Sequence, residues 1–257
     1  MFHTCILHCI HKCIEFFFYF RLLYRDLCLF IQHYLSLLAS FLPVQRCPKQ
    51  VWFKKLPSHL GIILCEERIS FSDISNLIVW SFCLGIHHVS IYDDTGFIKA
   101  NGEKLYEETN LRKKLYLKKK CTFNMVFSDG RVPFVYNTSR KNGYTTENTY
   151  VYLLSHEDGK QQIVKATKKL CKDAKTKPEI LNHFQAQNFE YYLKDVLDIP
   201  EPELIFHFGK TLGLIGYLPW HIRLSEILSY PTHHNITIEE FQKLLQRYSK
   251  CEQRFGK

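Results

Sequence analysis

The chain has 257 residues, of which 46% are hydrophobic and 23% are charged, a balance that belongs to a folded protein and excludes a disordered one. The length fits one globular domain with an appended segment, because a domain usually takes roughly 100–200 residues. A formal net charge of +9 favours anionic partners. No RNP-like, zinc-finger or helix-turn-helix pattern accompanies this charge, so we expect a membrane or a diphosphate as partner and no nucleic acid.

Residues 1–46 are predicted to associate with a membrane. Phe, Leu, Ile and Tyr dominate from Ile14 to Val44, and the stretch with the fewest polar residues, Leu27 to Leu42, is slightly shorter than the ~20 apolar residues of a membrane span. A tilted span and an amphipathic helix lying in the interface both fit this segment. No small-residue cleavage site follows it, so we expect the segment to be retained. Basic residues at 46–55 place the remaining chain on the cytoplasmic side by the positive-inside tendency.

The ten cysteines do not indicate a disulfide framework, because such frameworks belong to small secreted chains. Cys83 and Cys171 are expected to be buried free thiols. Cys5, Cys9 and Cys13 recur every four residues and would share one face of a helix. Because this run lacks the two separated ligand pairs of a zinc site, we interpret the three as free thiols, with acylation as the alternative.

After a linker over residues 47–57, strands and helices alternate. The apolar run from His59 to Leu64 predicts a buried parallel strand, and Ser72 can cap a helix from Asp73 to about Leu84. Val89 to Tyr92 predicts the next strand, which gives a right-handed βαβ unit. The later elements are predicted in chain order as a helix from Glu103 to Lys120, a loop over 121–146, a strand from Tyr150 to Leu154, helices from Lys160 to Cys171 and from Pro178 to Asn188, a strand from Leu204 to Phe206, and helices from Leu218 to Leu228 and from Ile238 to Tyr248.

This alternation predicts an α/β fold with a mainly parallel central sheet flanked by helices. Several segments together resemble one family, the Nogo-B receptor type, non-catalytic subunits of dehydrodolichyl diphosphate synthase, which belong to the undecaprenyl diphosphate synthase-like cis-prenyltransferases. The segments are His59-Leu60-Gly61-Ile62-Ile63-Leu64-Cys65, the unit from Trp80 to Tyr92, Ser155-His156-Glu157-Asp158-Gly159-Lys160, Leu218-Pro219-Trp220-His221-Ile222-Arg223, and Glu252-Gln253-Arg254-Phe255-Gly256-Lys257. The resemblance implies an undecaprenyl diphosphate synthase-like domain over residues 58–257, apart from the loop at 121–146.

The resemblance also implies that the chain has lost its own catalytic site. Active members follow the first strand with an aspartate and a Gly-Asn-Gly-Arg loop that holds an allylic diphosphate, whereas this sequence has Cys65-Glu66-Glu67-Arg68. A thiol is a poor ligand for Mg²⁺, and two carboxylates repel a diphosphate. We therefore expect Cys65 to replace the catalytic aspartate and the chain alone to hold no metal. Glu66 standing in for that aspartate is the less favoured alternative.

The second diphosphate site is altered as well. In place of an Arg-Thr-Gly-Gly-Glu segment the sequence reads His207-Phe208-Gly209-Lys210, and Gly213 and Ile215 stand where an arginine and a serine are implied. Lys210 is either a residual diphosphate contact or a surface lysine. Glu226 matches an acidic position that helps to hold Mg²⁺ in active relatives. Without a partner carboxylate we expect it to be structural, sharing a helical face with Arg223.

Arg254 and Gly256, in the tail over residues 251–257, match the Arg-x-Gly ending of the family. The resemblance implies that this tail crosses a dimer interface and meets the isopentenyl diphosphate that the catalytic partner holds. The residue types suit that task, because a guanidinium binds phosphate in a bidentate manner and glycine permits close backbone approach.

The implied function is that of an accessory subunit. Its partner would be the catalytic cis-prenyltransferase subunit of dehydrodolichyl diphosphate synthase, which holds most of the Mg²⁺ contacts and joins isopentenyl diphosphate to an allylic diphosphate. The product would be a long polyprenyl diphosphate for dolichol synthesis and protein glycosylation, made at the endoplasmic reticulum membrane. Two alternatives remain: a membrane receptor or lipid-binding adaptor that keeps only the fold, and an autonomous prenyltransferase that uses Glu66, Lys210 and Glu226.

Overall fold

A computed structural model describes residues 52–116, 123–129, 133–134, 148–182, 184–211 and 213–252, together with scattered positions between 12 and 27. The chain divides into two compact units, residues 1–45 and 46–257. The described positions of the first unit are helical, and the rings of Phe16 and Phe20 stack with centroids 6.4 Å apart. Within the described part of the chain, every helix is too short or too polar to cross a bilayer. Most of the predicted membrane segment lies outside the described residues.

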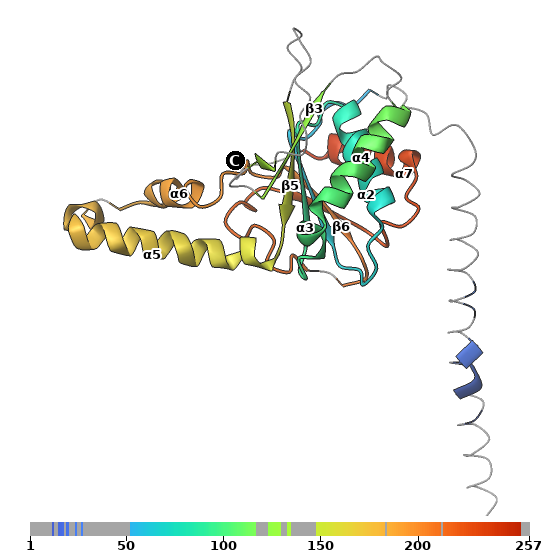
Figure 1. The fold of residues 1–257 in the computed structure, drawn as a ribbon, viewed down its shortest axis with the longest axis horizontal. Helices are drawn as coiled ribbons and strands as arrows, with labels where there is room; N and C mark the ends of the chain where they lie inside the picture. Colours follow the sequence, from blue (N-terminus) through green and yellow to red (C-terminus); the bar gives the residue numbers. More distant parts are fainter. Residues whose placement is uncertain are drawn as a thin grey trace, which may run out of the picture. The chain divides into compact units, whose positions relative to one another are not determined.

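In the described part of the second unit, seven strands form one sheet in the order β4-β3-β5-β2-β1-β6-β7 (Figure 1). Neighbouring strands run parallel except β3 and β4, which are antiparallel. The strands are β1 (His59–Leu64), β2 (His88–Asp93), β3 (Asn124–Ser128), β4 (Pro133–Phe134), β5 (Asn148–Leu154), β6 (Leu204–Phe208) and β7 (Glu226–Tyr230). The helices are α2 (Phe71–Cys83), α3 (Phe97–Ala100), α4 (Gly102–Tyr116), α5 (Lys160–Thr176), α6 (Ala186–Lys194) and α7 (Ile238–Lys250), with 3₁₀ turns at His156–Asp158 and Pro178–Leu181.

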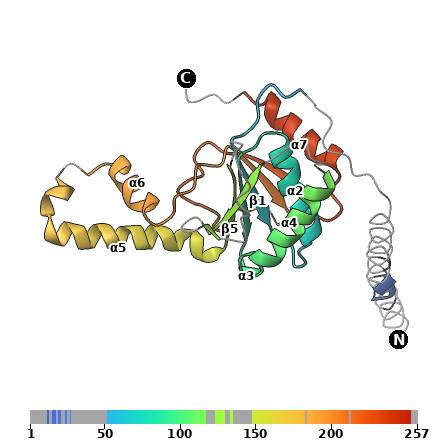
Figure 2. The ribbon, with the colours of Figure 1, turned by 45° about the horizontal axis from the view of Figure 1, so that its top comes forward.

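The two faces of the sheet are covered differently (Figures 1 and 2). Alternate strand residues such as Ile62 and Phe206 pack with α2, α4 and α7, and this main core includes Trp80 and Phe241. The opposite face, with Ile63, Ile205 and their neighbours, is covered by the buried Leu197 and Ile199 and by Tyr217 and Leu218. α5 and α6 pack on each other through a third cluster. Because both faces of β1 are covered, all six of its residues are buried.

A chain of buried polar groups crosses the second face. Burial lowers the pKa of His59 to about 3, so its ring is neutral. Nδ1 donates to the carbonyl oxygen of Pro200 at 2.7 Å, and Nε2 must then accept from the hydroxyl of Ser90 at 2.8 Å. Tyr217 therefore donates its own hydroxyl hydrogen to Ser90, at 2.6 Å. Each donor in this series of hydrogen bonds has one acceptor, and the series fixes how the segment around Tyr217 lies on the sheet.

The structure confirms the predicted strands over β1, β2, β5 and β6, and the helices over α2 and α7. Residues 121–146 were expected to be a loop, but they contain β3 and β4, which extend the sheet beyond β5. The helix expected from Pro178 to Asn188 is also wrong. The structure has a 3₁₀ turn at Pro178–Leu181, and α6 begins only at Ala186. Cys171, expected to be buried, is exposed on α5, and Cys83 is half-buried.

The helix expected from Leu218 to Leu228 does not exist. Turns occupy the first part and β7 the second. Leu218 has a φ of 36°, and Ile215, three residues before it, has a φ of 44°. The backbone at both positions is left-handed and cannot continue a right-handed helix. β7 lies at the end of the strand order, and its burial alternates because one face of the strand is covered and the other is exposed.

Replacing Gly61 with alanine is expected to lower the free energy of unfolding by about 1–3 kcal/mol. A Cβ at this position of β1 would lie 2.5 Å from the hydroxyl oxygen of Tyr217, which is fully buried and cannot move aside. The midpoint of urea unfolding measures the loss. In a Tyr217→Phe background the nearest atom is absent, so the same substitution should cost less. Equal losses in the two backgrounds would contradict this contact.

Candidate functional site

Strands β1, β2, β5 and β6 end at one edge of the sheet, which we call the carboxyl edge. The register places Leu64 opposite both Asp93 and Phe208. Gly209 continues β6 with a φ of 122°, and a Cβ there would lie 2.7 Å from the carbonyl oxygen of Cys65. The backbones that leave β1 and β6 thus touch, a closeness that requires glycine. In open parallel sheets, ligands bind outside this edge.

Cys65 is a protonated thiol at the centre of the carboxyl edge. Burial raises its pKa to about 11, and the carboxylates of Glu66 and Asp94 act in the same direction. Its Sγ lies 3.1 Å from Nε2 of His207, a buried ring whose Nδ1 has no hydrogen-bond partner within the described residues. A neutral thiol is neither a ligand that Mg²⁺ prefers nor an active nucleophile. Cys65 and His207 therefore do not fit a magnesium ion.

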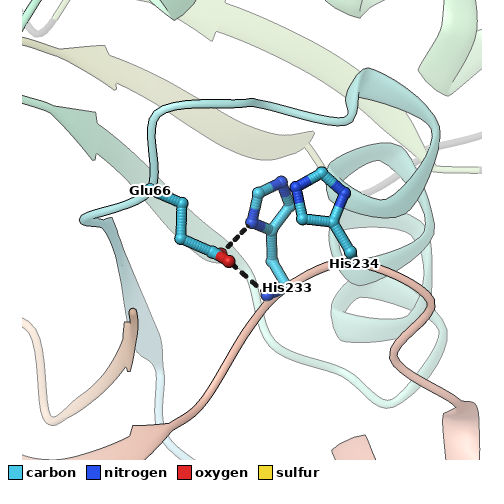
Figure 3. A group of neighbouring side chains, drawn as sticks. All are labelled: Glu66, His233 and His234. Carbon is cyan, nitrogen blue, oxygen red and sulfur yellow. Dashed lines mark hydrogen bonds and ion pairs between the residues drawn. The ribbon is translucent and has the colours of Figure 1, made fainter. Parts of the chain in front are cut away.

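Glu66 points toward His233 in the loop before α7 (Figure 3). Its carboxylate accepts from the backbone N–H of His233 at 2.9 Å and from Nδ1 of the same ring. Burial alone would raise the pKa of Glu66, but the hydrogen bonds from His233 and Thr232 outweigh it and lower the pKa to about 2. The carboxylate is therefore ionised and already bonded, so it is not available to replace the missing aspartate.

Glu66, His233 and His234 also form a group whose ligand atoms all lie within 4.8 Å of one another. The hydrogen-bond pattern does not suit a metal, because the backbone N–H of Ser70 donates to Nε2 of His233 at 2.9 Å. The neutral ring must then carry its proton on Nδ1, where a metal ion would have to bind. His234 uses Nε2 to donate to the carbonyl oxygen of Arg68 at 3.0 Å. We interpret the group as a structural tie between two loops.

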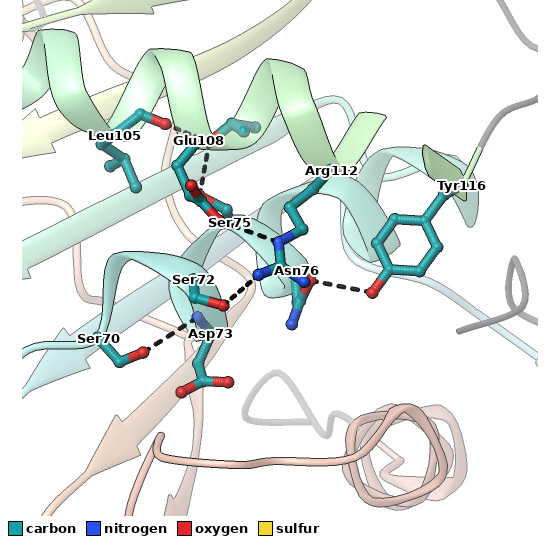
Figure 4. Close-up of polar contacts among 10 residues, drawn as sticks. Ser70, Ser72, Asp73, Ser75, Asn76, Leu105, Glu108, Arg112 and Tyr116 are labelled. Atoms are coloured by element: carbon teal, nitrogen blue, oxygen red, sulfur yellow. Dashed lines mark hydrogen bonds and ion pairs between the residues drawn. The ribbon is translucent and has the colours of Figure 1, made fainter. Parts of the chain in front are cut away.

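Ser70 connects this tie to α2 (Figure 4). Besides its contact with His233, its side-chain oxygen accepts from the backbone N–H of Asp73 at 3.3 Å and caps the helix. Ser70 is thus the N-cap, and not Ser72 as the sequence predicted. The Ser72 hydroxyl instead accepts from Nη2 of Arg112 on α4, at 2.6 Å. The carboxyl edge is held by bonds that reach into the main helical layer.

Two buried carboxylates at the carboxyl edge, those of Asp93 and Asp158, were not predicted as site residues from the sequence. Asp93 accepts from the backbone N–H groups of Phe97 at 2.8 Å and Ile98 at 3.1 Å, which caps α3. Asp158 accepts from Nζ of Lys99 at 2.6 Å and from the backbone N–H of Ser155 at 3.0 Å. The Ser155-x-x-Asp158 spacing is a capping-box pattern and could have revealed the second. Both carboxylates are already hydrogen-bonded, so neither is free to bind a metal or a substrate.

Residues 213–222 lie over the second face and close it. Tyr217 and Leu218 are buried there, and the carbonyl oxygen of Ile215 accepts from the hydroxyl of Tyr92. A Cβ at Gly213 would meet no atom within 4 Å, so this position is open. Lys210 is exposed, and its role as a diphosphate contact stays a prediction. The cavity next to this segment, lined by α5 and residues 218–221, has a volume of about 10 Å³, enough for about one water molecule.

Glu226 lies at the other end of the sheet, which we call the amino edge. It begins β7 opposite Leu204, and Leu204 is opposite Leu60 near the start of β1. A strand of five residues separates the two edges by about 15 Å. Within one chain, Glu226 therefore cannot share a metal ion with a ligand at Cys65.

The expected contact between Glu226 and Arg223 is wrong, because the helix that would have paired them is absent. Arg223 forms ion pairs with Glu190, at 3.3 Å, and with Glu201. These partners come from α6 and from the segment before β6. Arg223 thus ties residues 218–225 to their neighbours and takes no part in the carboxyl edge.

α7 runs from the carboxyl edge back to the amino edge. Its first residues follow the His233 loop that Glu66 holds, whereas the hydroxyl of Tyr248 near its end donates to Glu203, just before β6, at 3.2 Å. The chain therefore leaves the domain at Cys251 and Glu252 beside the amino edge. Arg254 and Gly256 lie outside the described residues.

The family model described as putative undecaprenyl diphosphate synthase matches residues 67–256. The chain belongs to this family. It is 34% identical over 206 residues to the dehydrodolichyl diphosphate synthase complex subunit NUS1 of Homo sapiens, with 79% of this chain and 68% of that protein covered. The corresponding subunit of Schizosaccharomyces pombe is 30% identical over 234 residues, with 86% and 87% covered. These relatives confirm the resemblance predicted from the sequence motifs.

A solved structure of lavandulyl diphosphate synthase from Lavandula x intermedia, in complex with dimethylallyl diphosphate, superposes with a TM-score of 0.54. The alignment covers 79% of this chain and 99% of that one at 16% identity, which shows a shared fold. Together with the family model, this likeness confirms the predicted undecaprenyl diphosphate synthase-like fold. Within this family fold, the carboxyl edge of the present chain carries a neutral thiol and a hydrogen-bonded glutamate.

The Glu66 tie is expected to make stability depend on acid pH. The pKa of Glu66 is lowered from 4.5 to about 2 on folding, so its contribution is complete above pH 4.5 and is lost as the pH falls toward 2. Glu66→Gln should remove this dependence and cost about 1.5–3 kcal/mol at neutral pH, the usual value of hydrogen bonds to a charged group. Urea unfolding of both proteins at several pH values tests this, and parallel curves between pH 4.5 and 2 would refute it.

Proposed function

We propose that this chain is the non-catalytic subunit of a heteromeric cis-prenyltransferase that makes long-chain polyprenyl diphosphate for dolichol synthesis and protein glycosylation. The observation that carries the proposal is the state of the carboxyl edge: the thiol of Cys65 is protonated and the carboxylate of Glu66 is bonded to His233. An edge of this kind is poorly suited to Mg²⁺ and a diphosphate, because it offers a thiol and a carboxylate that is already bonded. The relatives named as complex subunits support the same function.

The C-terminal tail is proposed to act on the partner, not on its own chain. α7 has 13 residues and is about 20 Å long, and it carries the chain away from the carboxyl edge. The three Cα–Cα steps from Cys251 to Arg254 can span at most about 11 Å. This limit favours a target on another chain, as the family resemblance implies for Arg254 and Gly256.

In the proposed complex, the partner binds isopentenyl diphosphate and the allylic diphosphate and provides most ligands for Mg²⁺. Mg²⁺ held by the partner would supply positive charge that assists departure of the allylic diphosphate. The guanidinium of Arg254 donates two parallel N–H bonds to the diphosphate of isopentenyl diphosphate, and Gly256 lets the backbone come close to it. This chain thus contributes positioning and positive charge while the partner carries the bond-forming step.

We also propose that residues 1–46 hold the complex at the endoplasmic reticulum membrane with the domain in the cytoplasm. The apolar composition of this segment and the basic residues that follow it support the proposal. An adaptor that keeps only the fold is less well supported, because it has no use for a diphosphate-binding tail. An autonomous enzyme is disfavoured because Glu66 and Glu226 lie at opposite edges of the sheet.

The purified chain is expected to show no isopentenyl incorporation by itself, with or without Mg²⁺. Cys65→Asp should not restore activity, because the glycine loop is still missing and the new carboxylate would lie beside Glu66 and Asp94. Incorporation of labelled isopentenyl diphosphate by the chain alone and by its complex with the catalytic subunit tests this. Turnover by the chain alone would exclude the proposed role.

Arg254→Ala is expected to lower kcat/KM for isopentenyl diphosphate in the complex about 10- to 100-fold, the usual effect of losing hydrogen bonds from a charged group. Arg254→Lys should keep part of the activity, since it retains the charge but not the bidentate geometry. Arg247→Ala is the matched control, because it removes an exposed arginine from α7 without touching the tail. Co-purification should be unchanged in all three. Full activity of Arg254→Ala would disprove the role of the tail.

A further inference from the structure

The linker that enters the domain is bonded to the end of α7, from which the tail leaves. The backbone N–H of Lys54 donates to the Ser249 hydroxyl oxygen at 2.7 Å, and that of Lys55 donates to the same oxygen at 3.4 Å. Ser249 is only 5% exposed. Nζ of Lys55 also lies 4.5 Å from the centre of the Tyr248 ring. Two successive residues of α7 are therefore in contact with two successive residues of the linker.

Glu203 extends these contacts to the start of β1. Its carboxylate accepts from the hydroxyl of Ser58 at 2.8 Å, from the backbone N–H of Ser58 at 3.2 Å, and from the hydroxyl of Tyr248 at 3.2 Å. Burial and the nearby Glu203 raise the pKa of Tyr248, so its hydroxyl keeps the proton that it donates. We call this set the linker clamp; it comprises Lys54, Lys55, Ser58, Glu203, Tyr248 and Ser249.

The clamp also rests on the main core. Phe53 and Leu56 of the linker pack against the cluster that contains Leu244, Leu245 and Tyr248 of α7. Apolar packing already fixes which face of α7 is buried, because Phe241, Leu244 and Tyr248 lie in the core. The hydroxyl of Ser249 adds direction, since it must face the backbone of Lys54. The clamp thus sets both the place and the orientation at which α7 ends.

We propose that Ser249 is a positioning residue for the prenyl transfer reaction: the linker clamp fixes the direction of the tail so that Arg254 meets the diphosphate in the partner. The proposal rests on the proposed function of the tail. The clamp fixes the point from which the residues after Cys251 leave the domain. A displacement of about 1 Å at a reacting group can cost on the order of 100-fold in rate. A bond five residues before Arg254 therefore influences the partner's site without touching the substrate.

The test compares four complexes: wild type, Ser249→Ala, Arg254→Ala and the double variant. Ser249→Ala should raise KM for isopentenyl diphosphate about two- to tenfold, the ratio that corresponds to losing one hydrogen bond, while kcat changes less. In the Arg254→Ala background the same substitution should have no further effect on KM, because the clamp acts through that side chain. Tyr248→Phe, which loses only the bond to Glu203, provides a second variant should Ser249→Ala fold poorly.

Ser70→Ala is the matched control, since it removes a serine hydrogen bond at the other end of the domain and should lower stability without raising KM. An equal KM effect of Ser249→Ala with and without Arg254 would overturn the inference, as would an unchanged KM in both clamp variants. In either case the proposed function stands if Arg254→Ala still impairs the complex. If Arg254→Ala is fully active, the proposed function itself fails and the inference falls with it.

Discussion

In the described sheet, six strands run in the same direction, and this common direction determines where each chemical group of the chain can act. Residues that follow the strands gather at the carboxyl edge, where Cys65 and Glu66 lie. Residues that precede them gather at the amino edge, where Glu226 and Glu203 lie. α7 returns the chain to the amino edge, so the tail starts far from the position that a substrate would occupy in its own chain. A contribution to another chain is the arrangement that this geometry favours.

The Glu66 tie lies at the carboxyl edge and satisfies hydrogen-bond donors there from within the chain. Here the backbone N–H and the ring of His233 are satisfied by a carboxylate that belongs to the chain itself. Because the bond is charge-assisted, it lowers the pKa of Glu66 and holds two loops together. The tie therefore stabilises the carboxyl edge through bonds within the chain.

Much of the fold could be predicted from the sequence because the central strands, such as β1 and β6, are continuous apolar runs buried on both faces. β7 was missed because an edge strand alternates, and its apolar residues also fit helical spacing. The left-handed backbone at Ile215 and Leu218 carries no sequence signal, since neither residue favours it. In the site, Cys65 could be found from its place after a strand. Its contact with His207 could not, because 142 residues separate them.

The attachment of the linker to α7 has a consequence for the length of the tail. Since the clamp fixes where α7 ends, the number of residues between Cys251 and Arg254 determines how far the guanidinium reaches. One residue more or fewer changes that reach by about 3.4 Å, which exceeds the tolerance of a hydrogen bond. If the tail acts as proposed, its spacing is thus as constrained as its composition, and its reach is counted from Ser249.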